Sequence, residues 1–166
     1  MDNALTSLLW STYLGGGADD AGYSVSLDVN ENLYISGGTS SVNFPVTAGT
    51  YSGSYLGGEA DGFIAHLTSD GNLTHSTYYG SYDYDQCYFV ELDSDGFVYV
   101  LGQTESTGST MIFNALYNVP NSGQFVSKLS SDLSTLEFST VFGKGGGQPA
   151  ISPTAFLVDY CNKIYI

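Results

Sequence analysis

One short segment occurs three times in this chain, and that repetition limits the folds open to it. The copies are LLWSTYLGG from Leu8, LTHSTYYGS from Leu73 and LEFSTVFGK from Leu136. Their shared serine stands 65 and then 63 residues further on, at Ser11, Ser76 and Ser139. A step of this size is the length of one supersecondary unit, so the chain is predicted to repeat one small structure.

Other blocks keep the same step. YSVSLDVNENLYISGGT from Tyr23 matches YFVELDSDGFVYVLGQT from Tyr88 and AFLVDYCNKIYI from Ala155, and DGFIAHLTSDGNL from Asp61 matches GQFVSKLSSDLSTL from Gly123. Aspartates align across the copies at Asp28, Asp93 and Asp159. We therefore expect three units: residues 1–72, whose first strand belongs to a preceding blade, residues 73–135, and a truncated unit at 136–166.

Each complete unit has the pattern of four strands. In the first unit the alternation of apolar and polar residues predicts strands at 23–28, 33–37, 62–68 and 73–79. The turns VNEN and SDGN supply residues that suit tight hairpins. The predicted fold is all-β, a β-propeller-like repeat of four-stranded antiparallel blades, about two and a half blades and incomplete. Two small duplicated β-sandwich subdomains are the alternative.

The last copy stops at KIYI, within its second strand, so we expect the chain to be a piece of a longer protein. Propellers close with four to eight blades, and an open stack exposes strand edges that pair with the remaining blades or with other copies.

The charge balance excludes two classes of partner. Seventeen acidic residues face three basic ones, a formal net charge of −14, which repels nucleic acid and anionic lipid. No apolar run approaches the ~20 residues that span a bilayer, so membrane insertion is not expected. Cys87 and Cys161 stand in unlike contexts and predict neither a disulfide framework nor a zinc site.

The first unit resembles the bacterial β-propeller repeat known as SBBP. The resemblance rests on STYLGG, DDAGYSVSLDVNENLYISGGTSS, VNFPVTAGTY and GGEADGFIAHLTSDGNL, with the family's recurring positions at Gly15, Gly16, Asp28, Tyr34, Phe44, Pro45, Asp61 and Phe63. The second unit departs from the pattern at Ser81 and Cys87. The resemblance implies a secreted or cell-surface bacterial protein, adhesins and gliding-associated proteins among them, whose export signal lies outside this fragment.

Candidate binding residues lie in the long connections, which a four-stranded meander gathers at the end opposite its tight turns. Carboxylates recur there at Asp19 and Asp20 and again at Asp83 and Asp85, and the second pair is a possible calcium site. Tyr51, Tyr55, Tyr82 and Tyr84 offer flat faces suited to sugars or peptides. Turn capping by the aspartates and packing of the tyrosines are the alternatives.

Catalytic patterns are weak. His66 and His75 are expected across one hairpin, where they could ligate a metal or serve as acid and base, but later units lack matching histidines. No G-x-S-x-G motif or phosphate-binding glycine loop occurs. We therefore expect no enzyme and no required cofactor, but a noncatalytic module whose long-loop face binds protein or glycan, for adhesion or as a scaffold. The alternatives are part of a propeller enzyme, such as a glycan-processing hydrolase, and a calcium-stabilised array.

Overall fold

Residues 20–79 form one antiparallel sheet in the computed structural model, which describes residues 4–166, so this sheet takes its last strand from beyond the predicted boundary at residue 72. The first three residues of the predicted unit 1–72 lie outside that range. The strands are β1 (Asp20–Leu27), β2 (Leu33–Thr39), β3 (Asp61–Leu67) and β4 (Leu73–Tyr79), hydrogen-bonded in chain order. All four strands predicted for this unit are confirmed, and no helix occurs among the described residues.

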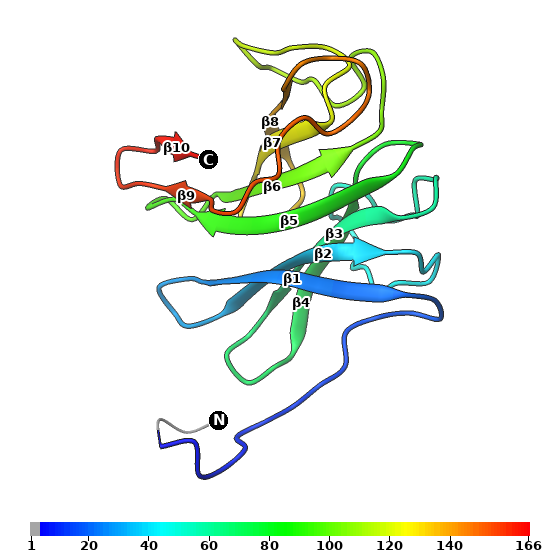
Figure 1. The fold of residues 1–166 in the computed structure, drawn as a ribbon. Helices are drawn as coiled ribbons and strands as arrows, with labels where there is room; N and C mark the ends of the chain where they lie inside the picture. Colours follow the sequence, from blue (N-terminus) through cyan, green and yellow to red (C-terminus); the bar gives the residue numbers. More distant parts are fainter. Residues whose placement is uncertain (1–3) are drawn as a thin grey trace.

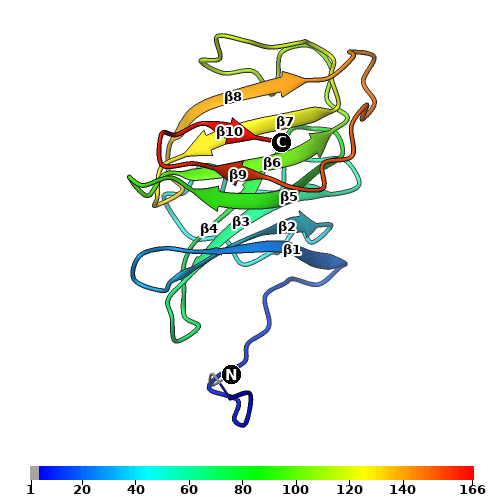
Figure 2. The ribbon, with the colours of Figure 1, turned by 60° about the vertical axis from the view of Figure 1, so that its left-hand side comes forward.

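The second unit repeats this sheet. Its strands are β5 (Asp85–Leu92), β6 (Val98–Thr104), β7 (Gln124–Leu129) and β8 (Leu136–Phe142), again in chain order. Even the irregularities recur, since β1 and β5 each shift register after their third residue, at Gly22 and Cys87. A third, two-stranded sheet is formed by β9 (Leu157–Val158) and β10 (Ile164–Tyr165), and its strand β9 lies beside β5 (Figures 1 and 2). The all-β prediction of four-stranded antiparallel sheets is thus confirmed, and the described sheets form an open stack.

Aligned aspartates build the tight turns at one end of the stack. Asp28 Oδ1 accepts hydrogen bonds from the backbone N–H groups of Asn30 and Asn32 at 2.8 and 2.9 Å. Asp93 and Asp159 do the same for the residues two and four positions after them. This local cap explains why an aspartate recurs at that position of every copy.

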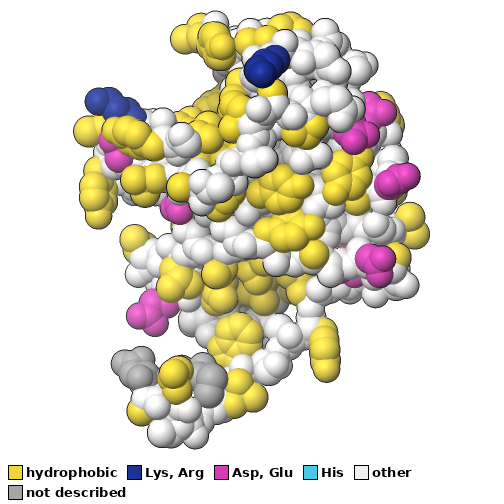
Figure 3. Space-filling model, in the orientation of Figure 1, with side chains coloured by type: hydrophobic (Ala, Val, Ile, Leu, Met, Phe, Trp, Pro, Cys, Tyr) yellow, Lys and Arg dark blue, Asp and Glu magenta, His cyan; other side chains and the backbone are white. Residues whose placement is uncertain are grey.

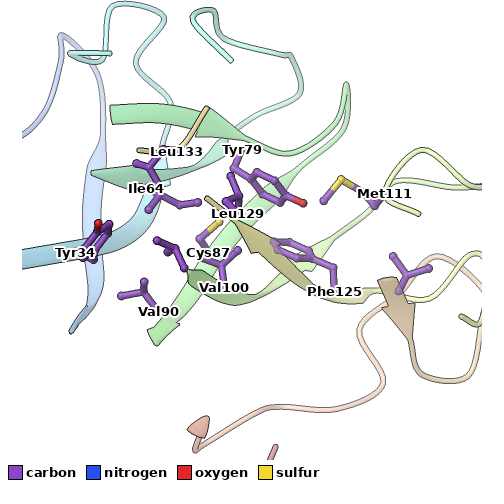
Figure 4. Packing of buried hydrophobic residues seen from close by; sticks show 12 residues of the cluster. Tyr34, Ile64, Tyr79, Cys87, Val90, Val100, Met111, Phe125, Leu129 and Leu133 are labelled. Atoms are coloured by element: carbon purple, nitrogen blue, oxygen red, sulfur yellow. The ribbon is translucent and has the colours of Figure 1, made fainter. Parts of the chain in front are cut away.

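The two large sheets pack face to face around the main apolar core. Tyr34, Ile64 and Tyr79 come from the first sheet, and they meet a larger set from the second: Cys87, Val90, Val98, Val100, Phe125 and Leu129 (Figure 4). Tyr79 also donates a hydrogen bond to Ser127 Oγ at 2.5 Å, which crosses between the sheets. Each unit is therefore a single sheet that relies on its neighbour, and the alternative of separate sandwich subdomains is wrong.

A glycine in each second strand lets an aromatic ring lie flat on the sheet. A Cβ at Gly37 would come within 2.0 Å of the Ala21 carbonyl and 2.5 Å of the Phe63 ring. Gly102 meets Gln86 and Phe125 in the same way, at 2.1 and 2.4 Å. Only glycine fits such a close approach of backbone and ring.

The first copy of the repeated segment does not form the expected strand. Residues 8–16 are extended but outside every sheet, and they run away from β1 (Figure 1). Trp10 Nε1 donates to the Ser69 carbonyl at 2.8 Å, which tethers the segment to the β3–β4 turn. β4 and β8 each pair with the strand before them, whereas the described part of the chain, residues 4–166, holds no such partner strand for residues 8–16.

Among residues 4–166, no helix has the length and apolarity needed to cross a bilayer.

Equivalent valines in β1 and β5 give a test of sheet packing. Val90 is 1% exposed between the sheets, whereas its counterpart Val25 is 59% exposed. Val90→Ala should lower the free energy of unfolding by about 2 kcal/mol, because it leaves a cavity in the core. Val25→Ala should change it by less than about 0.5 kcal/mol. Urea denaturation measures both, and equal losses would contradict the packing described here.

Candidate functional site at the long-loop end

A hydrogen-bonded carboxylate fixes the loop before the first strand of each sheet. Asp20 Oδ2 accepts from the Gly16 N–H at 2.7 Å, and Asp20 Oδ1 accepts from Thr39 Oγ1 at 2.5 Å. Thr39 Oγ1 in turn accepts from the Ser41 N–H at 2.9 Å. One carboxylate thus holds both the entry to β1 and the exit from β2.

The second sheet repeats this arrangement deeper in the protein. Asp85 Oδ2 accepts from the N–H and the hydroxyl of Ser81 at 2.6 and 2.7 Å, and Thr104 Oγ1 accepts from the Ser106 N–H at 2.9 Å. Asp85 has no exposed surface. Burial raises the pKa of its carboxyl, and the hydrogen bonds from Ser81 oppose that shift.

A second buried carboxyl lies where the two sheets meet. The Asp85 N–H donates to the Ala60 carbonyl at 2.9 Å, which places Asp85 beside the start of β3 at Asp61. Asp61 Oδ2 accepts from the Leu56 N–H at 2.5 Å, and Asp61 has no exposed surface. Burial raises the pKa of Asp61 to about 7, and the nearby Asp85 charge adds to the shift. The junction therefore contains two carboxyls whose pKa values are raised by burial.

An open hollow of about 600 Å³ lies at this junction. Its lining comes from the β2–β3 connection, the loop before β5 and the end of β6: Gly58, Glu59, Asp83, Tyr84, Gln103 and Glu105. Three of these side chains are acidic and none is basic. Figure 3 shows acidic groups along the right-hand edge, where the long connections lie in Figure 1, and no Lys or Arg there. Such a hollow attracts cationic groups and neutral polar ones and repels anions.

The predicted aspartates lie at two equivalent places, where a loop enters the first strand of a sheet. Asp19 is exposed in the loop and Asp20 is the half-buried first residue of β1, while Asp83 is exposed in the loop and Asp85 is the buried first residue of β5. Only Asp83 lines the hollow. Asp20 and Asp85 serve as caps for loop backbone.

The four predicted tyrosines do not share one surface. Tyr82 is 80% exposed in the loop before β5, and Tyr84 is half-buried in the hollow. Tyr55 packs edge-on against Tyr78 with ring centroids 5.8 Å apart, and Tyr51 packs on Tyr79 at 5.7 Å. Tyr82 and Tyr84 are therefore the pair with access to a ligand at the junction.

Sequence reasoning missed several residues of this hollow. Glu59, Gln103 and Glu105 line it, and Asp61 lies buried at the same junction. Each stands next to a strand end at the long-loop side. They could have been found by collecting every polar residue that stands next to a strand end on the long-loop side of the sheets.

Calcium at Asp83 and Asp85 stays a prediction. Within residues 4–166, no three His, Cys, Asp or Glu side chains come together closely enough to hold a metal ion. Any cation at this pair would need ligands beyond the side chains gathered there, such as water or backbone carbonyls.

Comparison with known families identifies a propeller repeat. The family model described as SBBP, a β-propeller repeat, matches residues 9–45. The match covers the extended segment, β1, β2 and the start of the β2–β3 connection. Residues 9–45 thus match a β-propeller repeat, and the antiparallel four-stranded sheets agree with that architecture. No curated protein gives a significant match to this sequence.

Because the pKa of the buried Asp61 is raised, we expect its contribution to the free energy of unfolding to fall as the pH rises. Because its folded pKa is raised to about 7, its stabilising contribution is complete below the unfolded value of about 3.9 and is lost as pH rises through 7. Asp61→Asn keeps an acceptor oxygen for Leu56 but cannot ionise. Between pH 4 and 7.5 the wild type should lose roughly 3–4 kcal/mol relative to this variant.

Denaturation of both proteins across that pH range measures the difference. The comparison cancels the opposite slopes of carboxyls such as Asp132, whose pKa serine hydrogen bonds lower to about 2. Parallel stability curves would show that Asp61 is charged or exposed in the folded protein.

Proposed function

We propose that this chain is a noncatalytic β-propeller module of a secreted or cell-surface bacterial protein. In this proposal its sheets pack against further blades, and its long-loop face contacts a protein or a glycan. SBBP repeats occur in extracellular proteins, which supports the location.

The observation that carries the proposal is the equivalence of two sheet faces. The second sheet buries Val90, Val100 and Leu129 against the first sheet. The same positions of the first sheet are Val25, Ile35 and Leu67, and they face away from the second sheet with Val25 largely exposed. Hydrophobic side chains gather below β1 in Figure 3. In the second sheet these positions are buried against the sheet that precedes it. The equivalent face of the first sheet therefore fits another blade of the same repeat.

The opposite side of the stack follows the same rule. The outer face of the second sheet carries Tyr99, Leu101 and Val126, and it packs against Phe156 and Val158 of the third unit. Each sheet thus presents one face to the unit before it and the other to the unit after it. A blade on the open face would continue this order.

The junction hollow supports a binding role for the long-loop face. Tyr82, next to Asp83 in the loop before β5, has an exposed ring, and the hollow is lined by three acidic side chains. An exposed ring and acidic groups suit neutral sugars or the Lys and Arg side chains of a protein. The noncatalytic role is supported by the use of Asp20, Asp61 and Asp85 as acceptors for loop backbone.

Self-association tests the open face. Light scattering of the wild type should give a mass that rises with concentration, and Val25→Asp should keep the protein monomeric because a charge cannot be buried there. Val42→Asp is the control, since Val42 is 74% exposed in the β2–β3 connection. A wild type that stays monomeric at every concentration would count against the proposal.

A polysaccharide panel tests the loop face and the absence of turnover together. Neutral glycans should bind to the wild type, and Tyr82→Ala should weaken that binding. New reducing ends during the incubation would instead favour the glycan-processing alternative. Thermal melts in calcium and in chelator address the third possibility, since a melting temperature that requires calcium would favour the calcium-stabilised array.

A further inference from the structure

A cation is built into the second sheet near its tight turns. Lys128 Nζ on β7 lies 2.8 Å from Asp93 Oδ2, the turn-capping aspartate. The same nitrogen lies over the rings of Phe97 and Tyr99, 4.1 and 4.9 Å from their centroids. This position of the repeat therefore accommodates a positive charge between a carboxylate and an aromatic face.

The first sheet has imidazoles at the equivalent place. His66 pairs across the sheet with Tyr34, as Lys128 pairs with Tyr99. Its ring stacks on Tyr34 with centroids 4.3 Å apart. On its other side His66 pairs with His75, where Lys128 has Phe138. Asp28 is the counterpart of Asp93, so the first sheet has the same carboxylate. In place of the permanently charged Lys128 it has His66.

The two histidines face each other through their ring nitrogens. Nδ1 of His66 lies 3.4 Å from Nδ1 of His75, and the two ring planes differ by only 16°. Two nitrogens bound at 2.0–2.1 Å to a tetrahedral metal stand about 3.4 Å apart. His66 Nδ1 also lies 2.8 Å from Thr74 Oγ1, so an ion held by both nitrogens would replace this contact with the hydroxyl.

The surroundings favour a cation at this pair. Asp28 of the β1–β2 turn and Asp132 of the β7–β8 turn act electrostatically on His66 and His75 respectively. Both histidines are half-buried, which leaves the remaining metal positions open to water. Burial also lowers the pKa of His66, which keeps the neutral, metal-binding form available at neutral pH.

We propose that His66 and His75 form a two-histidine site for a borderline divalent metal such as Zn²⁺, with water completing the coordination. The ion would lie between His66 and His75, the cross-strand pair that corresponds to Lys128 and Phe138 in the second sheet. It would join β3 to β4 and neutralise the turn-end carboxylates. Zinc should bind once per chain and raise the melting temperature by several degrees.

Zinc titration followed by calorimetry and by thermal melting tests the proposal. Cys161→Ser is used throughout as the background, because Cys161 is an exposed free thiol. His75→Phe copies Phe138, and His66→Lys copies Lys128, so both variants have a precedent in the second sheet. Each should abolish the stoichiometric binding and the gain in melting temperature. Mg²⁺, which carboxylates bind and imidazoles do not, should give neither effect.

Two results would overturn this site. Zinc binding that is unchanged in His75→Phe would place the metal elsewhere, and loss of binding in Asp83→Asn with both histidines intact would move it to the acidic hollow. Co²⁺ provides an independent readout, because a tetrahedral site with imidazole ligands gives visible absorption bands. Their absence in a wild type that binds Zn²⁺ would also contradict the proposal.

Discussion

Apolar contact between neighbouring sheets is the interaction on which this structure depends. A four-stranded sheet has two faces, both of them apolar here, and in the first sheet the β2–β3 connection covers only part of one face, through Phe44. The first sheet covers one face of the second, and the third unit covers the other. The hollow and the buried carboxyls at the loop end depend on this contact, because they lie where the two sheets meet.

The structural features that could be predicted from the sequence are those whose sequence pattern recurs in every copy of the repeat. Strand positions, hairpin turns and the order of the sheets could be derived from the alternation and from Asp28, Asp93 and Asp159, since these depend on local geometry. Residues 8–16 misled the same reasoning. Their sequence matches β4, yet a strand needs a neighbour that donates and accepts its hydrogen bonds, and pattern alone does not supply one.

The candidate site was less predictable because it is assembled from three loops. Asp83 and Tyr84 were found by repetition, whereas Glu59 and Glu105 have no repeated signature and are joined only by the contact between sheets. Asp85 was predicted as a possible calcium ligand, and the structure adds that it is buried and caps the backbone of Ser81. Burial of a loop residue depends on the neighbouring sheet, which a periodic pattern cannot reveal.

The turn-capping aspartates also bear on how such a chain folds. Each cap joins residues no more than four positions apart, and each sheet pairs only strands adjacent in sequence. The entropy lost on closing these loops is therefore small, and hairpins can form before distant segments meet. A meander of this kind can be completed blade by blade as the chain emerges during synthesis, and each finished sheet gives the next one a surface on which to condense.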